Sequence, residues 1–269
     1  MNVRALRWLI ADTFYQSLWS GAFWLFLTAS GICAVLCLVL PARYLSPPGI
    51  NIGANTLGLL LAVTFTAGFI PSFVDPTSAL ILLAKPVRRW QLLLGKFVGV
   101  LAVVALQSLI FVLATWLALG IATGKWSADY FWNFPLLVLN FTAFFSFSVM
   151  LAVTTRNTVA CVFGTIMFWL MCWLMNVGRH ALIAYDLEQF TTASRVLAEA
   201  GYWLLPKPAD LCVVQYNALS TEPVQSVVSD FGRVEDKGAF HPALSIVASL
   251  LFPLLTLVIS GYELESADY

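Results

Sequence analysis

A short basic segment, residues 75–96, offers the most distinctive chemistry in the chain. Its single acid is Asp75, and its basic residues are Lys85, Arg88, Arg89 and Lys96. Cationic side chains gathered in one short loop can form an electrostatic contact surface, and in membrane proteins such loops face the cytoplasm. The segment is therefore predicted to be a cytoplasmic surface on which another protein docks.

The same segment has a helical pattern that a plain linker does not need. Residues 78–84 are apolar and helix-compatible, Pro86 interrupts the helix, and residues 87–94 resume it into the next apolar run. A simple basic anchor remains an alternative, but it explains neither the Asp75-Pro76 start nor the apolar stretch. We favour a rigid pair of short helices against which a soluble partner can push.

A second group of polar side chains lies inside the apolar run at residues 134–154. Its members are neutral: Asn140, Thr142, Ser146 and Ser148. They could line a path for an amphipathic or lipid-like substrate. They could equally hold neighbouring helices together through hydrogen bonds of roughly 1 kcal/mol each. The sequence leaves both interpretations open.

Catalytic motifs are absent from the sequence. It contains neither the phosphate-binding G-x-x-x-x-G-K-[ST] pattern nor the zinc-binding H-E-x-x-H pattern. The only histidines are His180 and His241, and no carboxylate pair lies inside an apolar run. Intramembrane acid–base catalysis and proton-coupled transport therefore lack the residues that they need. The five cysteines form no evident metal site. We expect no enzyme, no metal and no cofactor in this chain, and an external source of energy.

The elements that carry these residues are predicted to be membrane-spanning helices. The chain is 60% hydrophobic and only 10% charged, and six long windows contain no Lys, Arg, Asp or Glu. Each window exceeds the roughly 20 residues that cross a bilayer core. The fold class expected is an all-α integral membrane protein with six transmembrane helices, placed near residues 19–40, 56–73, 97–121, 134–154, 158–176 and 243–262. Gly95 and Gly99 permit close helix packing where the third helix begins.

The distribution of basic residues predicts the orientation. The short segments on one side hold Arg4, Arg7, Arg156 and the basic residues of 75–96, whereas the short loops on the other hold only Arg43 and Lys125. We therefore expect both termini in the cytoplasm and the protein in the inner (cytoplasmic) membrane. Residues 1–18 are predicted to form an amphipathic elbow helix at the inner interface.

A large insertion, residues 177–239, precedes the last predicted span and should lie outside the cytoplasm. Apolar residues between 190 and 204 recur at helical spacing, and Pro206 and Pro208 should end that helix. An amphipathic helix is expected on the outer membrane surface, and residues 217–237 are expected to form a loop. A gate over an exit and an ordinary outer loop are both compatible with this pattern.

The run DPTSALILLAKPVRRWQLLLGKFVG, residues 75–99, resembles a segment of permease subunits of the ABC-2 exporter class. It is most similar to the branch described as permeases for multicopper-enzyme maturation. The resemblance implies a transmembrane domain over residues 1–269 that pairs with a separate ABC ATPase subunit, which binds ATP and Mg²⁺. It also implies a second permease half, as a homodimer or with a sister permease. No clustering of Met, His or Cys indicates a copper path.

The resemblance further implies roles for individual residues. A coupling helix in the ATPase cleft would fall on residues 75–89, with Asp75, Pro76, Lys85, Pro86, Arg88 and Arg89 at matching positions. The turn at Arg156 would add a smaller contact. The function expected is ATP-driven export; the alternative is a mechanotransmitting subunit or scaffold that acts on an outer partner without moving a solute. Membrane lipids should surround the chain, no nucleic-acid partner is expected, and the substrate is not specified.

Overall fold

Helices make up all the regular structure in the described part of the chain. The computed structural model describes residues 3–39, 89–185, 192–219 and 229–266, and no strand occurs within those ranges. The elements are α1 (Val3–Leu18), α2 (Gly21–Val39), α6 (Arg89–Thr123), the 3-10 helix η2 (Ala128–Trp132), α7 (Asn133–Thr155), α8 (Thr158–Tyr185), α9 (Thr192–Leu204), α10 (Pro208–Leu219), α11 (Ser229–Asp236) and α12 (Pro242–Ser266).

Four helices of the described ranges are long and apolar enough to cross a membrane. They are α6, α7 with the preceding η2, α8 and α12, and a fifth span results if the bent pair α1–α2 is counted as one. These match the predicted spans at both ends within a few residues, except that α6 begins earlier and α8 ends later. The predicted span at 56–73 lies outside the described residues, so the count of six stays a prediction.

The expected N-terminal helix is present as α1. It meets α2 at an angle of 59° across a short break at residues 19–20, which is the bend that an elbow requires. Its position at the membrane interface remains a prediction.

Aromatic side chains hold the long helices together at the centre of the bundle. Phe97 of α6 stacks on Phe145 of α7 at a centroid distance of 5.3 Å, and Phe168 of α8 lies 3.9 Å from Phe147 and 5.4 Å from Phe252 of α12. Lipid tails are as apolar as these rings, so close packing rather than water exclusion drives such association. Offset stacking adds about 0.5–1.5 kcal/mol for each pair.

The close approach expected near Gly99 is confirmed. A Cβ atom on Gly99 would lie 2.6 Å from Cβ of Thr13 and 3.2 Å from the carbonyl oxygen of Ile10, both on α1. No side chain larger than hydrogen fits there without moving α1. Glycine therefore sets the distance between α1 and α6.

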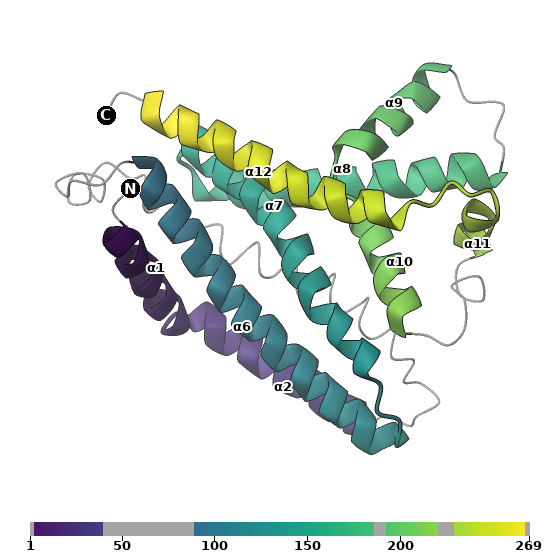
Figure 1. Ribbon diagram of the computed structural model, residues 1–269, viewed down its shortest axis with the longest axis horizontal. Coiled ribbons are helices and arrows are strands. Elements are labelled where there is room, and N and C mark those ends of the chain that lie inside the picture. The colour runs from purple at the N-terminus through teal and green to yellow at the C-terminus, as the bar shows by residue number, and fades with distance from the viewer. Residues whose placement is uncertain (1–2, 40–88, 186–191, 220–228, 267–269) are drawn as a thin grey trace.

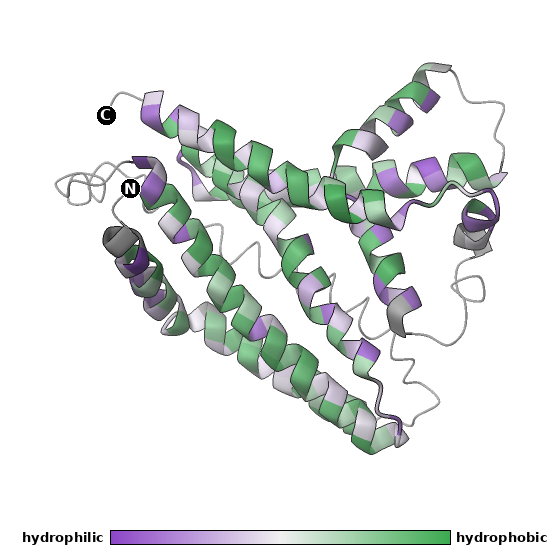
Figure 2. Ribbon diagram, viewed as in Figure 1, coloured by the Kyte–Doolittle hydropathy of each residue, from purple (hydrophilic) through white to green (hydrophobic). Residues whose placement is uncertain are grey.

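The bundle has two chemically different ends (Figure 1). At the end that we call the Arg156 end, α6 begins, α7 turns into α8, α12 finishes, and α1 begins nearby. At the opposite end, the insertion end, α9, α10 and α11 gather around the last turns of α8 and the first turns of α12. Apolar residues cover the long helices, while polar residues concentrate toward the ends and on the insertion (Figure 2).

The insertion contains more helix than the sequence predicted. α9 ends at Leu204, just before Pro206, as expected. The predicted loop at 217–237 is wrong over residues 217–219, which end α10, and over residues 229–236, which form α11. Eight residues do not form a stable helix alone, but α11 packs on α8: Lys237, just after it, donates a hydrogen bond to the carbonyl of Ile183 at 2.7 Å. That tertiary support is invisible in the local pattern.

Candidate functional site

A buried carboxylate, Asp210, organises a polar cluster at the insertion end. Pro208 is the first residue of α10 and places Asp210 in its first turn, where an acid interacts favourably with the helix dipole. The whole Asp210 side chain is buried. A charge in such a position must be compensated by hydrogen bonds or by opposite charge.

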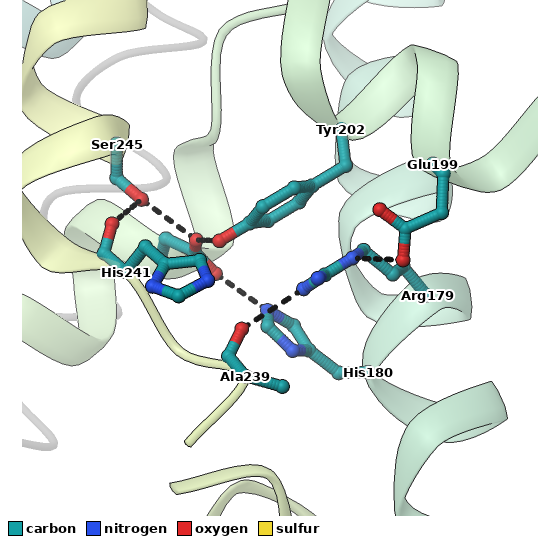
Figure 3. A network of polar contacts seen from close by, with 8 residues as sticks. Arg179, His180, Glu199, Tyr202, Ala239, His241 and Ser245 are labelled. Atoms are coloured by element: carbon teal, nitrogen blue, oxygen red, sulfur yellow. Dashed lines mark hydrogen bonds and ion pairs between the residues drawn. The ribbon is translucent and has the colours of Figure 1, made fainter. Parts of the chain in front are cut away.

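Three side chains from three helices converge on this carboxylate (Figure 3). Nε2 of His180 on α8 lies 2.6 Å from Oδ1, while Oδ2 accepts hydrogen bonds from the hydroxyls of Tyr202 on α9, at 3.0 Å, and Ser245 on α12, at 2.7 Å. Burial alone raises the pKa of Asp210, but the hydrogen bond and charge of His180, with the Ser245 and Tyr202 bonds, lower it overall. Asp210 is therefore an ionised centre that ties α8, α9, α10 and α12 together.

Arg179 adds a second set of contacts beside the carboxylate. Its Nε donates to Glu199 Oε1 at 2.9 Å, its Nη1 donates to the carbonyl oxygen of Ala239 at 3.1 Å, and its guanidinium lies 3.8 Å from the centre of the Tyr202 ring. The Glu199 side chain is 46% exposed, so solvent screens the Arg179–Glu199 ion pair. Its contribution to folding stability is therefore limited to about 1 kcal/mol or less. The role of Arg179 is to fix the insertion against the end of α8.

Lys207 is the second cation on Tyr202. Its Nζ lies 4.7 Å from the ring centre, its side chain is buried, and it has no hydrogen-bond partner among the described residues. Burial lowers the pKa of Lys207 to about 8, with Asp210 opposing the decrease and Arg179 adding to it. Burial and the Asp210 charge raise the pKa of Tyr202 to about 12, so the phenol stays protonated and continues to donate.

The arrangement excludes a serine-type catalytic triad. In a triad the histidine accepts the serine proton, and the carboxylate lies on the far side of the ring. Here Ser245 donates to Asp210 instead, and the carboxylate stands between the hydroxyl and the imidazole. Within the described residues, no group of three or more His, Cys, Asp or Glu could hold a metal ion. The cluster is built to join helices and to present charge.

The two predicted partner-contact residues that the structure describes, Arg89 and Arg156, lie at the Arg156 end. Arg156 is exposed and has a left-handed backbone (φ 51°), with its N–H bonded to the carbonyl of Ala152 at 3.0 Å. The side chain of Asn157 then caps α8 by accepting from the N–H of Val159 at 2.9 Å. The expected tight turn is therefore present, with the positive charge at its tip.

Arg89 begins α6 and reaches the end of α12. Its Nη1 donates to the carbonyl oxygen of Leu264 at 3.3 Å, and this bond closes the Arg156 end. The other predicted contact residues lie outside the described residues: Asp75, Pro76, Lys85, Pro86 and Arg88. Their role stays a prediction.

The predicted path residues all lie on α7. Asn140, Ser146 and Ser148 are buried, and Thr142 is half-buried. Thr142 donates to the carbonyl of Val138 at 2.6 Å, and Ser146 donates to that of Ala143 at 2.8 Å. These two hydroxyls are thus satisfied within their own helix, whereas Oδ1 of Asn140 has no partner among the described residues. Lining a path remains a prediction for the group.

The family model for ABC-2 family transporter proteins matches residues 10–260. That range covers the described helices except the first residues of α1 and the last residues of α12. The chain belongs to the ABC-2 family. No curated protein shows significant similarity to it. As an ABC-2 protein it is a multi-pass membrane subunit of an ABC transporter, and it carries the transporter and permease character that the sequence predicted; the multicopper branch stays a prediction.

Sequence reasoning did not find the cluster in this ABC-2 protein. It named His180 only as one of two histidines and gave Arg179, Lys207 and Asp210 no role. The sequence offers only a weak indication of the cluster. Arg179 and His180 are adjacent at the end of a long apolar run, and Glu199 and Asp210 follow them in the insertion. Only the packing of α9 and α10 onto α8 brings them together.

Proposed function

We propose that this ABC-2 subunit is the permease of an exporter and that a separate ATPase drives it by acting on the Arg156 end. The observation that carries the proposal is the length of α6, which runs without a break for 35 residues. At 1.5 Å per residue it extends about 52 Å, well beyond a hydrocarbon core of about 30 Å. Its first turns therefore project from the membrane as a rigid extension of a span.

A rigid helix transmits displacement from one side of a membrane to the other. A push near Arg89 moves α6 as a unit, and through the Arg89–Leu264 bond it also moves α12. α12 carries Ser245 into the Asp210 cluster at the opposite end. The two ends of the bundle are thereby connected by two continuous helices, which is the connection that ATP-driven transport requires.

The remaining assignments follow from family membership and from charge. The ATPase supplies the ATP and Mg²⁺ site, a second permease copy or sister subunit completes the transporter, and the basic Arg156 end faces the cytoplasm of the inner membrane. Residues Asp75 to Arg89 and Arg156 form the ATPase contact, and the α7 residues Asn140, Thr142, Ser146 and Ser148 border the path. No observation in the structure favours the mechanotransmitting alternative.

A photo-crosslinking residue placed at either end tests this proposal. Position 156 and position 125 are both exposed charged sites. Position 156 lies between α7 and α8 at the Arg156 end, whereas position 125 directly follows the far end of α6 (Figure 1). In native membranes, the probe at 156 should capture a nucleotide-binding protein, and the matched probe at 125 should not. Capture at 125 alone, or at neither position in well-folded protein, would overturn the proposed polarity.

A further inference from the structure

We infer that the core beneath the Asp210 cluster binds the acidic group of an amphipathic ligand, with Lys207 as its principal cation. Its identification with the exporter's substrate rests on the proposed function; the binding site itself rests on four buried polar side chains. These are Lys207, Asn176 on α8, Ser249 on α12 and Asn140 on α7. Each has a side-chain polar atom without a hydrogen-bond partner among the described residues.

Two of these side chains lie directly beneath the cluster. Asn176 precedes His180 by four residues on α8, and Ser249 follows Ser245 by four residues on α12. Residues four apart occupy the same helix face, one turn from each other. Because His180 and Ser245 both bond to Asp210, Asn176 and Ser249 lie one turn further into the bundle, on the faces that meet there.

Asn140 lies at about the same depth in the bundle as Ser249. It lies one turn from Phe144, whose ring centroid is 6.0 Å from that of Phe168. Ser249 lies about one turn from Phe252, which stacks on the same Phe168 ring. The two polar residues therefore approach from α7 and α12 at the same depth, on the insertion side of the aromatic stack.

The charges of the Asp210 cluster favour an anionic group directly beneath it. The buried part of the cluster holds two cations, Arg179 and Lys207, against one fully buried carboxylate, since Glu199 is half-exposed. Asp210 already accepts three hydrogen bonds, and none comes from Lys207. A buried ammonium without an acceptor is costly. A carboxylate or phosphate group would accept from Lys207 and offset its repulsion with Arg179.

The surroundings also indicate what the rest of the ligand is like. Amide and hydroxyl groups of Asn176, Ser249 and Asn140 can hydrogen-bond the oxygens of an acidic group. The contacting rings of Phe144, Phe168 and Phe252 follow, about one turn from Asn140 and Ser249 and about two turns from Asn176. They offer only apolar contact. A small free anion would accept the hydrogen bonds but leave the aromatic rings without a partner. A lipid-like acid would accept the hydrogen bonds and also contact the rings.

Unfolding measurements on the full chain in neutral detergent test the inference. The probes are inorganic phosphate, dioctanoyl phosphatidylglycerol and, as the uncharged-headgroup control, dioctanoyl phosphatidylcholine. We expect saturable stabilisation by phosphatidylglycerol, weaker or no stabilisation by phosphate, and none specific to phosphatidylcholine. Lys207→Met should weaken phosphatidylglycerol binding at least tenfold, and Asn176→Leu should weaken it several-fold. The control Lys125→Met, at an exposed site, should bind like the wild type.

The outcomes separate this inference from the ATPase proposal. Saturable phosphate binding of equal strength, lost in Lys207→Met, supports the anion site and assigns it to small anions. The inference is overturned if no acidic probe binds saturably, if Lys207→Met binds as well as wild type, or if phosphatidylcholine competes equally. No ATPase is present in the ligand-binding assay, so its result does not depend on whether position 156 crosslinks to a nucleotide-binding protein. The crosslinking result, in turn, does not depend on ligand binding.

Discussion

Nε2 of His180 and Oδ1 of Asp210 lie 2.6 Å apart, in side chains that are 2% and 0% exposed. The two residues are 30 positions apart and come from α8 and α10. Their contact, with those of Tyr202 and Ser245, joins four helices at one point. Because these helices include two membrane spans and two helices of the insertion, the pair is the main structural link between the insertion and the bundle.

Removing the carboxylate should disrupt this link. Asp210→Ala leaves three buried partners without their acceptor, and the loss of one member of such a buried charge network costs about 3–5 kcal/mol. Unfolding followed by tryptophan fluorescence in detergent would measure it. The exposed Asp129→Ala serves as control and should change stability by no more than about 0.5 kcal/mol. A variant at Asp210 as stable as the control would contradict the central position of this residue.

Tyr202 contributes through both its hydroxyl and its ring, and two variants separate them. Tyr202→Phe removes the bond to Asp210 but keeps the ring, so we expect a loss of about 1 kcal/mol. Tyr202→Leu also removes the surface on which Arg179 and Lys207 lie, and each cation–π contact adds about 1–2 kcal/mol. Equal losses in the two variants would show that the ring contacts contribute nothing.

The burial of Lys207 predicts a pH dependence of stability. The pKa of Lys207 is lowered from 10.5 to about 8 in the folded protein, so between these values the unfolded chain binds a proton that the folded chain has released. Stability should therefore rise with pH from about 8 toward 10.5, relative to Lys207→Met. Below pH 8 and without an anion, Lys207→Met should be at least as stable as wild type. A pH-independent difference between the two proteins would argue against a buried ammonium.

Two glycines should respond to alanine in opposite directions. Gly99→Ala places a methyl group 2.6 Å from Thr13 Cβ and should separate α1 from α6, at a cost of about 1–3 kcal/mol. Gly178→Ala meets nothing within 4 Å and should stabilise α8 by about 0.5–1 kcal/mol. Thr13→Gly should partly restore the Gly99→Ala protein. Equal effects at the two glycines would mean that α1 does not pack closely on α6.

Arg156 allows stability and partner contact to be separated. Its positive φ of 51° is unfavourable for a side chain, so Arg156→Gly should raise stability by up to about 1 kcal/mol. The same variant removes the charge and should lower the ATP hydrolysis of the co-purified complex. Arg156→Lys, which keeps the charge, is the control for the second effect. If Arg156→Gly hydrolyses ATP like Arg156→Lys, the turn is not a contact for the ATPase.

The long helices could be predicted from sequence because uninterrupted apolar runs are sufficient evidence for a span. Arg179 and His180 misled the prediction of the end of α8, since charges usually mark the end of a span and here they continue the helix to Tyr185. They are tolerated because Glu199 and Asp210 compensate them. Those partners are 20 and 30 residues away, beyond the range of any local periodicity.

The small elements of the insertion were harder to predict for the same reason. Pro206 and Pro208 act locally, and the end of α9 was expected, whereas α10 after it was not. α11 depends on contacts with α8, which no short window of sequence contains. At the Arg156 end, by contrast, the turn of Arg156 and Asn157 has local causes and was expected where it occurs.

Co-purification tests the ATPase-driven permease most directly. Tagged wild-type protein and Arg88→Glu/Arg89→Glu would be isolated from mildly solubilised native membranes, with Lys125→Glu as the matched charge reversal at the other end, and the co-eluting proteins identified by mass spectrometry. A nucleotide-binding subunit should be recovered with wild type and Lys125→Glu and lost from the double variant. The membrane domain of the double variant should remain folded, although it loses the Arg89–Leu264 hydrogen bond. Recovery of that subunit in full with the double variant, or of no ATPase with folded wild type, would contradict the account.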